Sequence, residues 1–547
     1  MKRILFSLIL TVLISITVRA QISVGYINGY YSDYPVSAID FENLTYISMS
    51  FVYPQANGSI SVDSWFLNRQ LVDAAHAHGT KVIVSVGGYG GSDGFSPMAA
   101  DTAARRNFVK NLVDFCTANG FDGADLDWEY PAAKDRDNLT ALVSEIRQAF
   151  NNAGISSLSM AITSTDWSNV YDIANLKDNI DWFGVMTYDY YGTWESTSGN
   201  DAPLYSSSKQ TGSMDYSVKY YLGRGMPKDK MCVGMPFGGY LLNSKAMYSA
   251  NSGGASYSYI QATDKLKQGW EFHWDGTCKQ PYLQNPGHTQ LITYDDTVSI
   301  KLKCEYVRKN NLKGTIIWKI GRDYSSQTGT TPLLNMIGKY LLSYPSEIPQ
   351  APSPSSPAGG ETKDSTSLTF IWAPNDLTTS YSLQVSTASD FSNFVINKSG
   401  IDLTDYAVNN LNYGTKYYWR VSAANLNGES GWSAVQSFTT KENITGVGVL
   451  KPEVPENFSL ENYPNPFNPA TVITYQLPAS GKINLKVYDI LGNEVVTLVD
   501  GEQSAGNYMM VFGTQQNTDG RQLSSGIYIC VLRAGGSVLT RKLELMK

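Results

Sequence analysis

Apolar positions along the first part of the chain alternate between short runs and segments of helical period. Short apolar runs predict buried strands, and apolar residues three or four apart predict the helices that cover them. The predicted helices span 65–78, 102–119 and 138–153. The predicted strands span 22–31, 44–53, 81–87, the acidic run within 121–131, 158–164, 182–189, 231–237 and 314–319. This alternation predicts a parallel (β/α)8 TIM barrel over residues 21–343.

The remaining segments predict further domains. Residues 241–310 separate the seventh and eighth strands by more chain than one helix uses, which predicts an inserted subdomain or, alternatively, an elaborated loop. Residues 344–360 are rich in Pro and Ser and predict a linker. Short strands at β-sandwich spacing follow in 361–441 and again in 461–547, with a second linker at 442–460. The sequence therefore predicts a multidomain protein in which two all-β sandwich domains follow the barrel.

Residues 1–20 combine a basic start, an apolar run and a small-residue end. Lys2 and Arg3 precede the run Ile4–Val18, and the segment closes at Ala20. This pattern predicts a secretory signal peptide cleaved after Ala20. A membrane helix is the alternative, although the run is short for spanning a bilayer. We therefore expect a secreted, extracellular protein without a membrane span, or one displayed at an outer-membrane surface.

Net charge, cysteines and histidines limit which partners, disulfide bonds and metal sites can be expected. The net charge is −7 and the isoelectric point about 5.3, which argues against a nucleic-acid partner. Five scattered cysteines suggest no disulfide framework, although a pair between Cys278 and Cys304 stays open. The four histidines show no metal-ligand spacing. We expect no cofactor and no metal, and a monomer by default.

Four carboxylates crowd one run of the chain: Asp122, Asp125, Asp127 and Glu129. The last three lie two residues apart, and alternate side chains of a strand share a face, about 6.6 Å apart along the chain. Like charges this close cannot all ionise freely, so at least one should hold a proton near neutral pH. Such a cluster supplies an acid beside a base. A solvated edge strand and a site for a hard cation are the alternatives.

Four motifs, in their order along the chain, resemble family 18 glycoside hydrolases, a family that contains many chitinases. The acidic run matches the signature Asp-x-x-Asp-x-Asp-x-Glu, with its Gly and Trp in register. Lys81–Gly88 resembles the family's Ser-x-Gly-Gly strand, and Phe183–Asp189 resembles its Met-x-Tyr-Asp strand. Gly314–Trp318 resembles its last strand, which ends in Trp. The resemblance covers residues 22–342.

The resemblance implies roles for the catalytic candidates. Glu129 would act as general acid and then as base, and Asp127 would accept a hydrogen bond from the substrate's acetamido N–H. Asp125 would share a proton with Asp127, and Tyr188 would hold the acetamido carbonyl. Asp122 is expected to be structural. No second carboxylate stands out as a nucleophile, and this family is an exception that uses the substrate itself, whose acetamido oxygen attacks the anomeric carbon.

The resemblance also implies a substrate-binding set around these acids. Inner-barrel polar groups would relay to the acids, the strand motif Met-x-Tyr-Asp would line the cleaved subsite, and aromatic rings would form its floor and its leaving-group side. The polar groups are Tyr26 and Ser85, and the residues of the Met-x-Tyr-Asp strand are Met186 and Asp189. Trp318 is the floor, and Trp194 lies on the leaving-group side. Two departures concern the rim: Tyr89 stands where the family has Trp, and the segment ending at Tyr240 lacks the family's Tyr and Arg. Tyr240 is the candidate substitute.

Two further resemblances concern the chain beyond the barrel. Leu411 and Tyr417 resemble the tyrosine corner of immunoglobulin-like folds, and 361–441 resembles a fibronectin type III domain. We interpret it as a spacer, with polysaccharide binding as the alternative. Residues 461–547 open with the turn formers Asn462–Pro469 and resemble the C-terminal sorting domain of type IX secretion. That resemblance implies the type IX secretion machinery as a partner and a tail removed on export; an adhesive β-sandwich is the alternative.

Together these resemblances imply a secreted chitinase acting on chitin or N-acetylglucosamine oligosaccharides with retention. An endo-β-N-acetylglucosaminidase acting on N-glycans uses the same acidic signature, and a peptidoglycan-directed glucosaminidase is a third hypothesis. A non-catalytic carbohydrate-binding surface protein is the alternative from a different class. Silent relatives usually lose the final Glu of the signature, and Glu129 is present. Endo or exo action and chain-end direction stay open.

Overall fold

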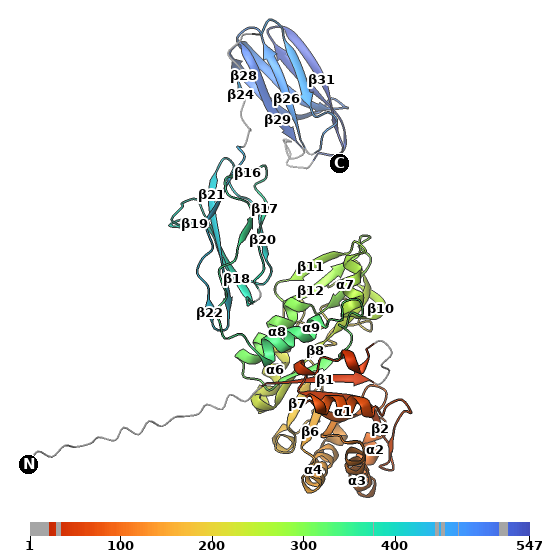
Figure 1. Cartoon of the computed structure of the whole chain (residues 1–547). Helices are drawn as coiled ribbons and strands as arrows, with labels where there is room; N and C mark the ends of the chain where they lie inside the picture. The colour runs from red at the N-terminus through yellow and green to blue at the C-terminus, as the bar shows by residue number, and fades with distance from the viewer. Residues whose placement is uncertain are drawn as a thin grey trace, which may run out of the picture.

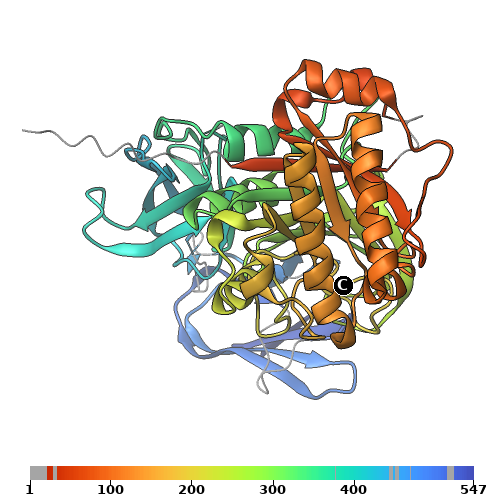
Figure 2. The ribbon, with the colours of Figure 1, turned by 90° about the horizontal axis from the view of Figure 1, so that it is seen from below.

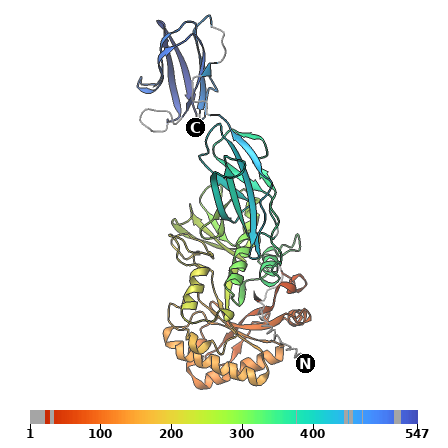
Figure 3. The same cartoon turned by 90° about the vertical axis from the view of Figure 1, so that its left-hand side faces the viewer.

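The computed structural model describes residues 21–28, 34–375, 377–442, 448–449, 455–468, 470–513 and 523–546. The predicted signal peptide at 1–20 lies outside these residues, as does the end of the first predicted strand at 29–31. Within the described ranges, no helix is both long and apolar enough to cross a membrane. Figures 1 and 3 show three bodies in a row: the barrel with its insertion, a middle β-domain and a C-terminal β-domain.

Eight described strands close into a parallel barrel. Around the ring they are β1 (Ile22–Asn28), β2 (Tyr46–Pro54), β4 (Lys81–Gly87), β5 (Gly123–Asp127), β6 (Ser157–Ile162), β7 (Trp182–Val185), β8 (Met231–Pro236) and β14 (Gly314–Trp318). β1 pairs in parallel with both β2 and β14, which closes the ring. A short strand, β3 (Ile60–Ser61), extends β2. The predicted (β/α)8 TIM barrel is confirmed, and it puts all the strand C-termini at one end.

Helices cover the outside of the barrel, and Figure 2 shows the orange helices α3 and α4 lying side by side over it. The helices are α1 (Arg69–Ala77), α2 (Phe95–Ala100), α3 (Thr102–Asn119), α4 (Arg136–Ala153), α5 (Ile173–Leu176), α6 (Met214–Gly223), α8 (Thr297–Lys309) and α9 (Pro332–Ile337). Single turns occur at η1 (Val36–Ala38), η2 (Phe41–Asn43), η3 (Ala133–Asp135), η4 (Lys228–Lys230) and η5 (Gly338–Leu342).

Capping residues decide where these helices begin and end. In α3 the Asp101 carboxylate accepts a hydrogen bond from the N–H of Ala104 at 2.7 Å, and Gly120 ends the helix at φ 74°. The predicted helix over 102–119 is therefore confirmed. The helix predicted from Trp65 instead begins at Arg69, because Asn68 caps it through the N–H of Leu71.

An antiparallel sheet is inserted between β8 and α8. Its strands are β9 (Gly238–Ser244), β10 (Asn251–Ser258), β11 (Glu271–Asp275), β12 (Gln280–Gln284) and β13 (Leu291–Tyr294), paired in the order β10-β9-β13-β12-β11, and α7 (Tyr259–Leu266) packs on them. The inserted sheet thus spans Gly238–Tyr294, whereas the sequence suggested 241–310. The difference arises because α8 is a barrel helix: Ile300 and Val307 lie in the barrel core.

The two β-domains each contain two described sheets around a separate core. The middle domain contains β15 (Pro354–Ser356), β16 (Glu361–Lys363), β17 (Leu368–Trp372), β18 (Ser380–Ser386), β19 (Phe394–Ile401), β20 (Asp405–Val408), β21 (Lys416–Asn425), β22 (Gly428–Glu429) and β23 (Gln436–Thr440). The C-terminal domain contains β24 (Gly448–Val449), β25 (Ser459–Tyr463), β26 (Ala470–Leu477), β27 (Gly481–Asp489), β28 (Glu494–Gln503), β29 (Gly506–Gly513), β30 (Gly526–Ala534) and β31 (Ser537–Leu545). The Tyr417 hydroxyl accepts a hydrogen bond from the N–H of Asn412 at 2.8 Å, as in a tyrosine corner.

The middle domain is docked against both the inserted sheet and the barrel. Asp402 accepts hydrogen bonds from Lys279 Nζ at 2.6 Å and from Trp274 Nε1 at 3.2 Å. Lys301 Nζ, on α8, donates to the carbonyl of Thr378 at 2.8 Å. The segment predicted as a linker at 344–360 is also engaged, because β15 pairs with β17 inside the middle domain.

The cysteines are buried and unbridged. Cys116, Cys232, Cys278, Cys304 and Cys530 are all free thiols. The pairing of Cys278 with Cys304 that the sequence left open is therefore wrong. Cys304 lies in the barrel core, whereas the Cys278 sulfur lies 3.6 Å from the hydroxyl of Tyr248.

Candidate active site

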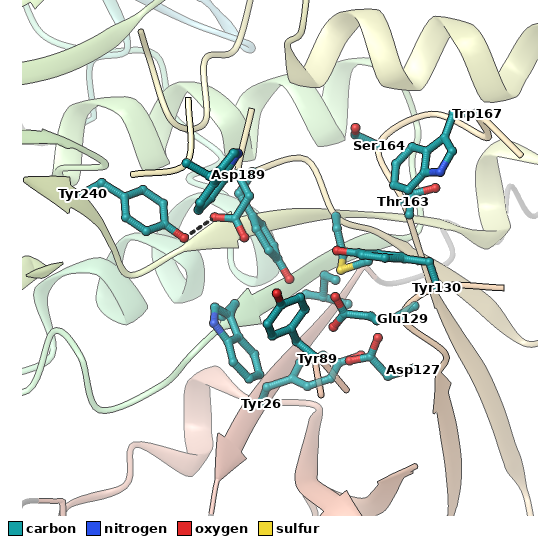
Figure 4. Close-up of a pocket in the computed structure, with 16 residues that line it drawn as sticks. Tyr26, Tyr89, Asp127, Glu129, Tyr130, Thr163, Ser164, Trp167, Asp189 and Tyr240 are labelled. Carbon is teal, nitrogen blue, oxygen red and sulfur yellow. Dashed lines mark hydrogen bonds between the residues drawn. The ribbon is translucent and has the colours of Figure 1, made fainter. Parts of the chain in front are cut away.

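Strand β5 brings the acidic run to the open end of the barrel. Asp125 and Asp127 are buried on its inner face, and Trp128 turns the other way to stack on Phe95, with ring centroids 4.9 Å apart. The strand ends at Asp127, so Glu129 lies beyond it and not within one regular strand as the spacing suggested. The structure still brings the three acids close enough for their charges to interact, and Asp127 and Glu129 line the cleft (Figure 4).

Close backbone contacts fix this strand end. The N–H of Gly88 donates to the carbonyl of Asp127 at 2.7 Å, and Gly87 adopts φ 104°. A Cβ on Gly87 would lie 2.3 Å from that carbonyl oxygen, so only glycine fits. Ser92 Oγ accepts the N–H of Glu129 at 2.9 Å. The Gly-Gly motif therefore acts here by letting two loops approach closely.

Asp125 lies beneath the cleft in a cage of hydroxyl donors. Tyr26 and Ser85 each donate to its Oδ2 at 2.8 Å, and Ser159 donates to its Oδ1 at 2.7 Å. Burial raises the pKa of Asp125, while these three hydrogen bonds lower it. The predicted contacts of Tyr26 and Ser85 with the acids are present. Ser159, on β6, was missed by the sequence reasoning, although a serine between apolar strand residues was a usable signal.

Asp127 has the opposite environment. Its Oδ1 is buried without a hydrogen-bond partner among the described residues. Burial, followed by the charges of Glu129 and Asp125, holds the pKa of Asp127 well above its usual range. Asp127 is therefore the member of the cluster that keeps a proton most readily, and one of its oxygens is left without a hydrogen-bond partner in the wall of the cleft.

Glu129 is partly buried and faces the cleft. Burial raises its pKa, a hydrogen bond with Tyr130 lowers it, and the nearby charge of Asp189 raises it again. The net shift is upward, which keeps this carboxyl protonated closer to neutral pH than an exposed Glu. Such a carboxyl can donate a proton to a leaving oxygen.

The loop after β7 supplies the opposite wall. Met186, Tyr188 and Asp189 all line the cleft. Burial and the charge of Asp127 hold the pKa of Tyr188 far above its usual range, so its phenol stays a hydrogen-bond donor. Asp189 adopts a left-handed backbone conformation at φ 59°, and its Oδ1 accepts the Tyr240 hydroxyl at 2.8 Å, as Figure 4 shows. Tyr240 thus contacts the cleft from the inserted sheet.

The cleft has a volume of about 610 Å³ and aromatic walls. Trp318 lies in it beside Tyr26, with ring centroids 6.0 Å apart. Trp194 is 56% exposed and packs edge-on against Tyr240. On the other side of the acids, Trp167 packs edge-on against Tyr130, a pair that the sequence reasoning missed (Figure 4). The rim thus offers flat apolar surfaces on both sides of the carboxylates.

Other predicted and possible sites lie elsewhere. Asp122 is at the opposite end of β5, where its Oδ2 accepts the N–H of Val82 and contacts His76 Nε2, both at 2.8 Å. This is a structural arrangement away from the cleft. Across the part of the chain that the structure describes, no group of three or more His, Cys, Asp or Glu side chains has a geometry for holding a metal ion.

This barrel and its acidic cleft place the chain in a known class. The sequence profile of glycosyl hydrolases family 18 matches residues 23–323, more than half of the chain, and the chain belongs to that family. Among its relatives, chitinase A1 of Niallia circulans is 30% identical over 284 residues, covering 44% of this chain and 40% of the relative. A probable endochitinase of Caenorhabditis elegans is 32% identical over 296 residues, covering 48% of each. The chain spans about half the length of the curated relatives it matches.

Solved structures support the same class. Catalytic domain 2 of the Ostrinia furnacalis Group II chitinase aligns with a TM-score of 0.56 and 29% identity, covering 60% of this chain and 97% of that one. The Group IV chitinase of the same insect, solved in complex with allosamidin, aligns with a TM-score of 0.53 and 27% identity, covering 58% and 97%.

The remaining domains match other profiles. Residues 461–545 match the secretion system C-terminal sorting domain, which indicates an extracellular or cell-surface protein and confirms that resemblance. Residues 360–440 match the N-terminal domain of purple acid phosphatase, whose fold is similar to fibronectin type III. The assignment to fibronectin type III itself stays a prediction.

Proposed function

We propose that this chain is a secreted chitinase that hydrolyses β-1,4-linked N-acetylglucosamine polymers with retention of configuration. The observation that carries the proposal is Asp127, a buried carboxyl with an unpartnered oxygen that lines one cleft together with Glu129 and Tyr188. A 2-acetamido group matches this pocket: it brings an N–H for Asp127 and a carbonyl oxygen for Tyr188. The relatives named chitinases support the same substrate class.

The reaction proceeds in two steps, as expected for substrate-assisted hydrolysis in this family. Glu129 donates its proton to the glycosidic oxygen, and the bond from that oxygen to the anomeric carbon breaks. The acetamido carbonyl oxygen attacks the anomeric carbon from the other side and forms an oxazolinium ion. Water then adds at the anomeric carbon, Glu129 takes the proton from that water, and the acetamido group is restored with net retention.

Neighbouring residues favour the charged intermediate. Asp127 accepts the acetamido N–H and, once its proton has moved to Asp125, offsets the positive charge of the intermediate, while Tyr188 orients the carbonyl oxygen through its hydroxyl. Asp125, which accepts hydrogen bonds from Tyr26, Ser85 and Ser159, shares a proton with Asp127 and takes it up when Asp127 must be charged. Trp318 is the apolar floor under the cleaved sugar, and Met186 and Asp189 line the same subsite. Trp194 is the platform on the leaving-group side.

The rest of the chain serves delivery and placement. We propose a division into a signal peptide (1–20), the catalytic barrel (21–343), a connecting segment at 344–360 of which Pro354–Ser356 pairs with the middle domain, a fibronectin-like spacer (361–441), a linker at 442–460 and a sorting tail (461–547). The sorting-domain match supports recognition of the tail by the type IX secretion machinery. If the tail is removed on export, the intact mass of the secreted enzyme will lack the residues that follow about 461.

The decisive test uses chito-oligosaccharides in which one N-acetylglucosamine is replaced by glucosamine. Because the acetamido oxygen is the nucleophile, cleavage should stop wherever glucosamine occupies the cleaved position and continue at acetylated positions. Product analysis by mass spectrometry gives the cleavage sites, and NMR of fresh products gives the anomer. Equal cleavage at both sugars would assign the nucleophile to the protein and contradict the proposal.

The rival substrates are outcomes of the same series. A high-mannose glycopeptide and a peptidoglycan fragment are incubated beside chitohexaose at equal enzyme concentration. Faster cleavage of the glycopeptide would make the enzyme an endo-β-N-acetylglucosaminidase acting on N-glycans. Binding without turnover on all three would make the barrel a non-catalytic carbohydrate-binding protein.

A further inference from the structure

Asp201 lies directly behind Asp189, out of reach of solvent. It is fully buried within the loop after β7, in a run of buried residues from 198 to 204. Its N–H donates to Thr293 Oγ1 at 2.9 Å, and its carbonyl accepts the N–H of Tyr190 at 3.0 Å. Its carboxyl Oδ1 accepts the N–H of Asp189 at 3.1 Å. The Asp201 side chain therefore holds the backbone of Asp189 in its left-handed conformation.

The second carboxyl oxygen of Asp201 makes no hydrogen bond to the described residues. Oδ2 is buried without a hydrogen-bond partner among the described residues. An ionised carboxylate left in this state would be costly, whereas a protonated one is tolerated. The geometry thus favours the neutral acid, in which one oxygen accepts from Asp189 and the other carries a proton.

The groups that face Asp201 come from every element packed around it. Two carboxyls are near, Asp189 on the same loop and Asp295 after β13, and three other ionisable groups are Lys303 on α8, Tyr240 on β9 and Arg322 after β14. Lys303 is committed to Asp295 in a fully buried ion pair. Burial and the charges of Asp189 and Asp295 hold the pKa of Asp201 well above its usual range, although the hydrogen bond from the Asp189 N–H and the charge of Lys303 oppose this.

We propose that Asp201 is a positioning residue that works as a neutral acid, fixing Asp189 in the cleft so that Asp189 can bind the sugar. The inference rests on the proposed function and adds a residue that touches no substrate. When Asp201 ionises, its unpartnered oxygen must be hydrated, and the loop that carries Asp189 must move. Substrate affinity should therefore fall at alkaline pH, whereas the chemistry at Glu129 reports separately through kcat.

The experiment compares the full chain with Asp201→Asn and Asp201→Leu. Asparagine keeps the acceptor oxygen and cannot ionise, so its KM for chitohexaose should stay flat with pH. The wild-type KM should rise by up to about tenfold per pH unit once Asp201 has ionised. Asp201→Leu lacks the acceptor and should raise KM at every pH, and rescue of KM by Asn relative to Leu identifies the hydrogen bond to Asp189.

A second measurement needs no activity. An Asp that ionises at about pH 4 when unfolded but stays protonated when folded destabilises the protein as pH rises above that value. The Tm of Asp201→Asn should therefore exceed that of the wild type by an amount that grows with pH. The Tm measurement tests whether Asp201 is protonated, and it does so even without enzyme activity. Failure of the wild type to cleave chitohexaose would refute the proposed function and leave this test in place.

Asp323→Asn is the matched control. Burial raises the pKa of Asp323 to about 7, and its Oδ2 accepts the N–H groups of Leu333 and Leu334 at 3.0 Å, away from the cleft. This variant should show the same kind of growing Tm difference, with a KM profile that follows the wild type. A wild-type KM that stays as flat as that of Asp201→Asn, or a Tm difference independent of pH, overturns the proposal.

Discussion

An aspartate lies at each end of strand β5, and the two differ in whether their carboxyl oxygens have hydrogen-bond partners. At the lower end, Asp122 accepts the N–H of Val82 and contacts His76. At the upper end, Asp127 keeps an unpartnered oxygen and lies beside Asp125 and Glu129. Buried polar groups normally find partners, so an unsatisfied cluster marks the end that has a task beyond stability. At the lower end of the barrel, the Asp122 carboxylate has hydrogen-bond partners and only stabilises the fold.

Two hollows of the barrel repeat this contrast. The upper cleft of about 610 Å³ contains Glu129 and exposed aromatic rings. A hollow of about 280 Å³ at the lower end contains Lys230, whose Nζ donates to the carbonyls of Lys177 and Ile180. The ammonium group of Lys230 is thus already used in backbone hydrogen bonds. The difference fits the rule that TIM-barrel chemistry sits at the C-terminal strand ends.

The largest expected effect comes from removing the proton donor at the upper end. Glu129→Gln should lower kcat by ~10²–10⁴-fold, the usual worth of a positioned general acid. Binding of tri-N-acetylchitotriose should persist, because the amide keeps the shape of the carboxyl. Calorimetry measures the binding and a reducing-end assay the turnover. Near-normal kcat in this variant would show that the upper cluster is as structural as Asp122.

The next effect is on pH dependence. Activity needs Glu129 protonated, so kcat/KM should fall about tenfold per pH unit above its raised pKa. The charge of Asp189 helps to raise that pKa. Asp189→Asn should therefore move the alkaline limb of the profile to lower pH, in addition to weakening sugar binding. A limb that stays in place would mean that Asp189 does not influence Glu129.

A smaller effect is expected at the aromatic rim. Trp194 is half exposed and lies against Tyr240, where a sugar ring can stack. Trp194→Ala should cost about 1 kcal/mol of binding, or roughly fivefold in KM for chitohexaose. The disaccharide-length substrate serves as the control, since it does not reach as far along the cleft. Equal losses on both substrates would indicate a general structural defect.

The smallest functional effect is expected at the lower end. Asp122→Asn weakens a partly exposed, charge-assisted contact and should lower the free energy of unfolding by about 1 kcal/mol. Its kcat and KM should equal those of the wild type, which makes it the partner control for Glu129→Gln. Urea denaturation measures the first quantity. A large loss of activity without loss of stability would erase the contrast between the two ends.

The local parts of this architecture could be predicted from the sequence. The spacing of Asp125, Asp127 and Glu129, the glycine after α3 and the motif ending at Asp189 depend on neighbours along the chain. The missed features join residues that are distant along the chain: Ser159 on β6 donates to Asp125 on the neighbouring strand β5, and Trp167 packs against Tyr130 from another loop. The pairing of neighbouring strands brings Ser159 to Asp125, and the gathering of loops at one end of the barrel brings Trp167 to Tyr130.

Irregular segments were the other source of error. β7 ends at Val185, before the predicted end at Asp189, because the chain leaves the sheet to present Tyr188 and Asp189 to the cleft. The Pro-rich segment 344–360 suggested a free tether, yet part of it pairs as β15. In both places contacts with distant parts of the chain determined the backbone conformation, and local composition alone could not predict it.

The contact at Asp402 has a mechanical consequence. This residue of the middle domain grips Lys279 and Trp274 of the inserted sheet, the same sheet whose Tyr240 touches Asp189 in the cleft. Tension applied to the chain beyond the barrel is therefore carried both to a wall of the groove and, through Lys301, to helix α8 of the barrel. If the enzyme is anchored at a cell surface while it is bound to an insoluble polymer, the pulling force would act on the wall of its substrate-binding cleft.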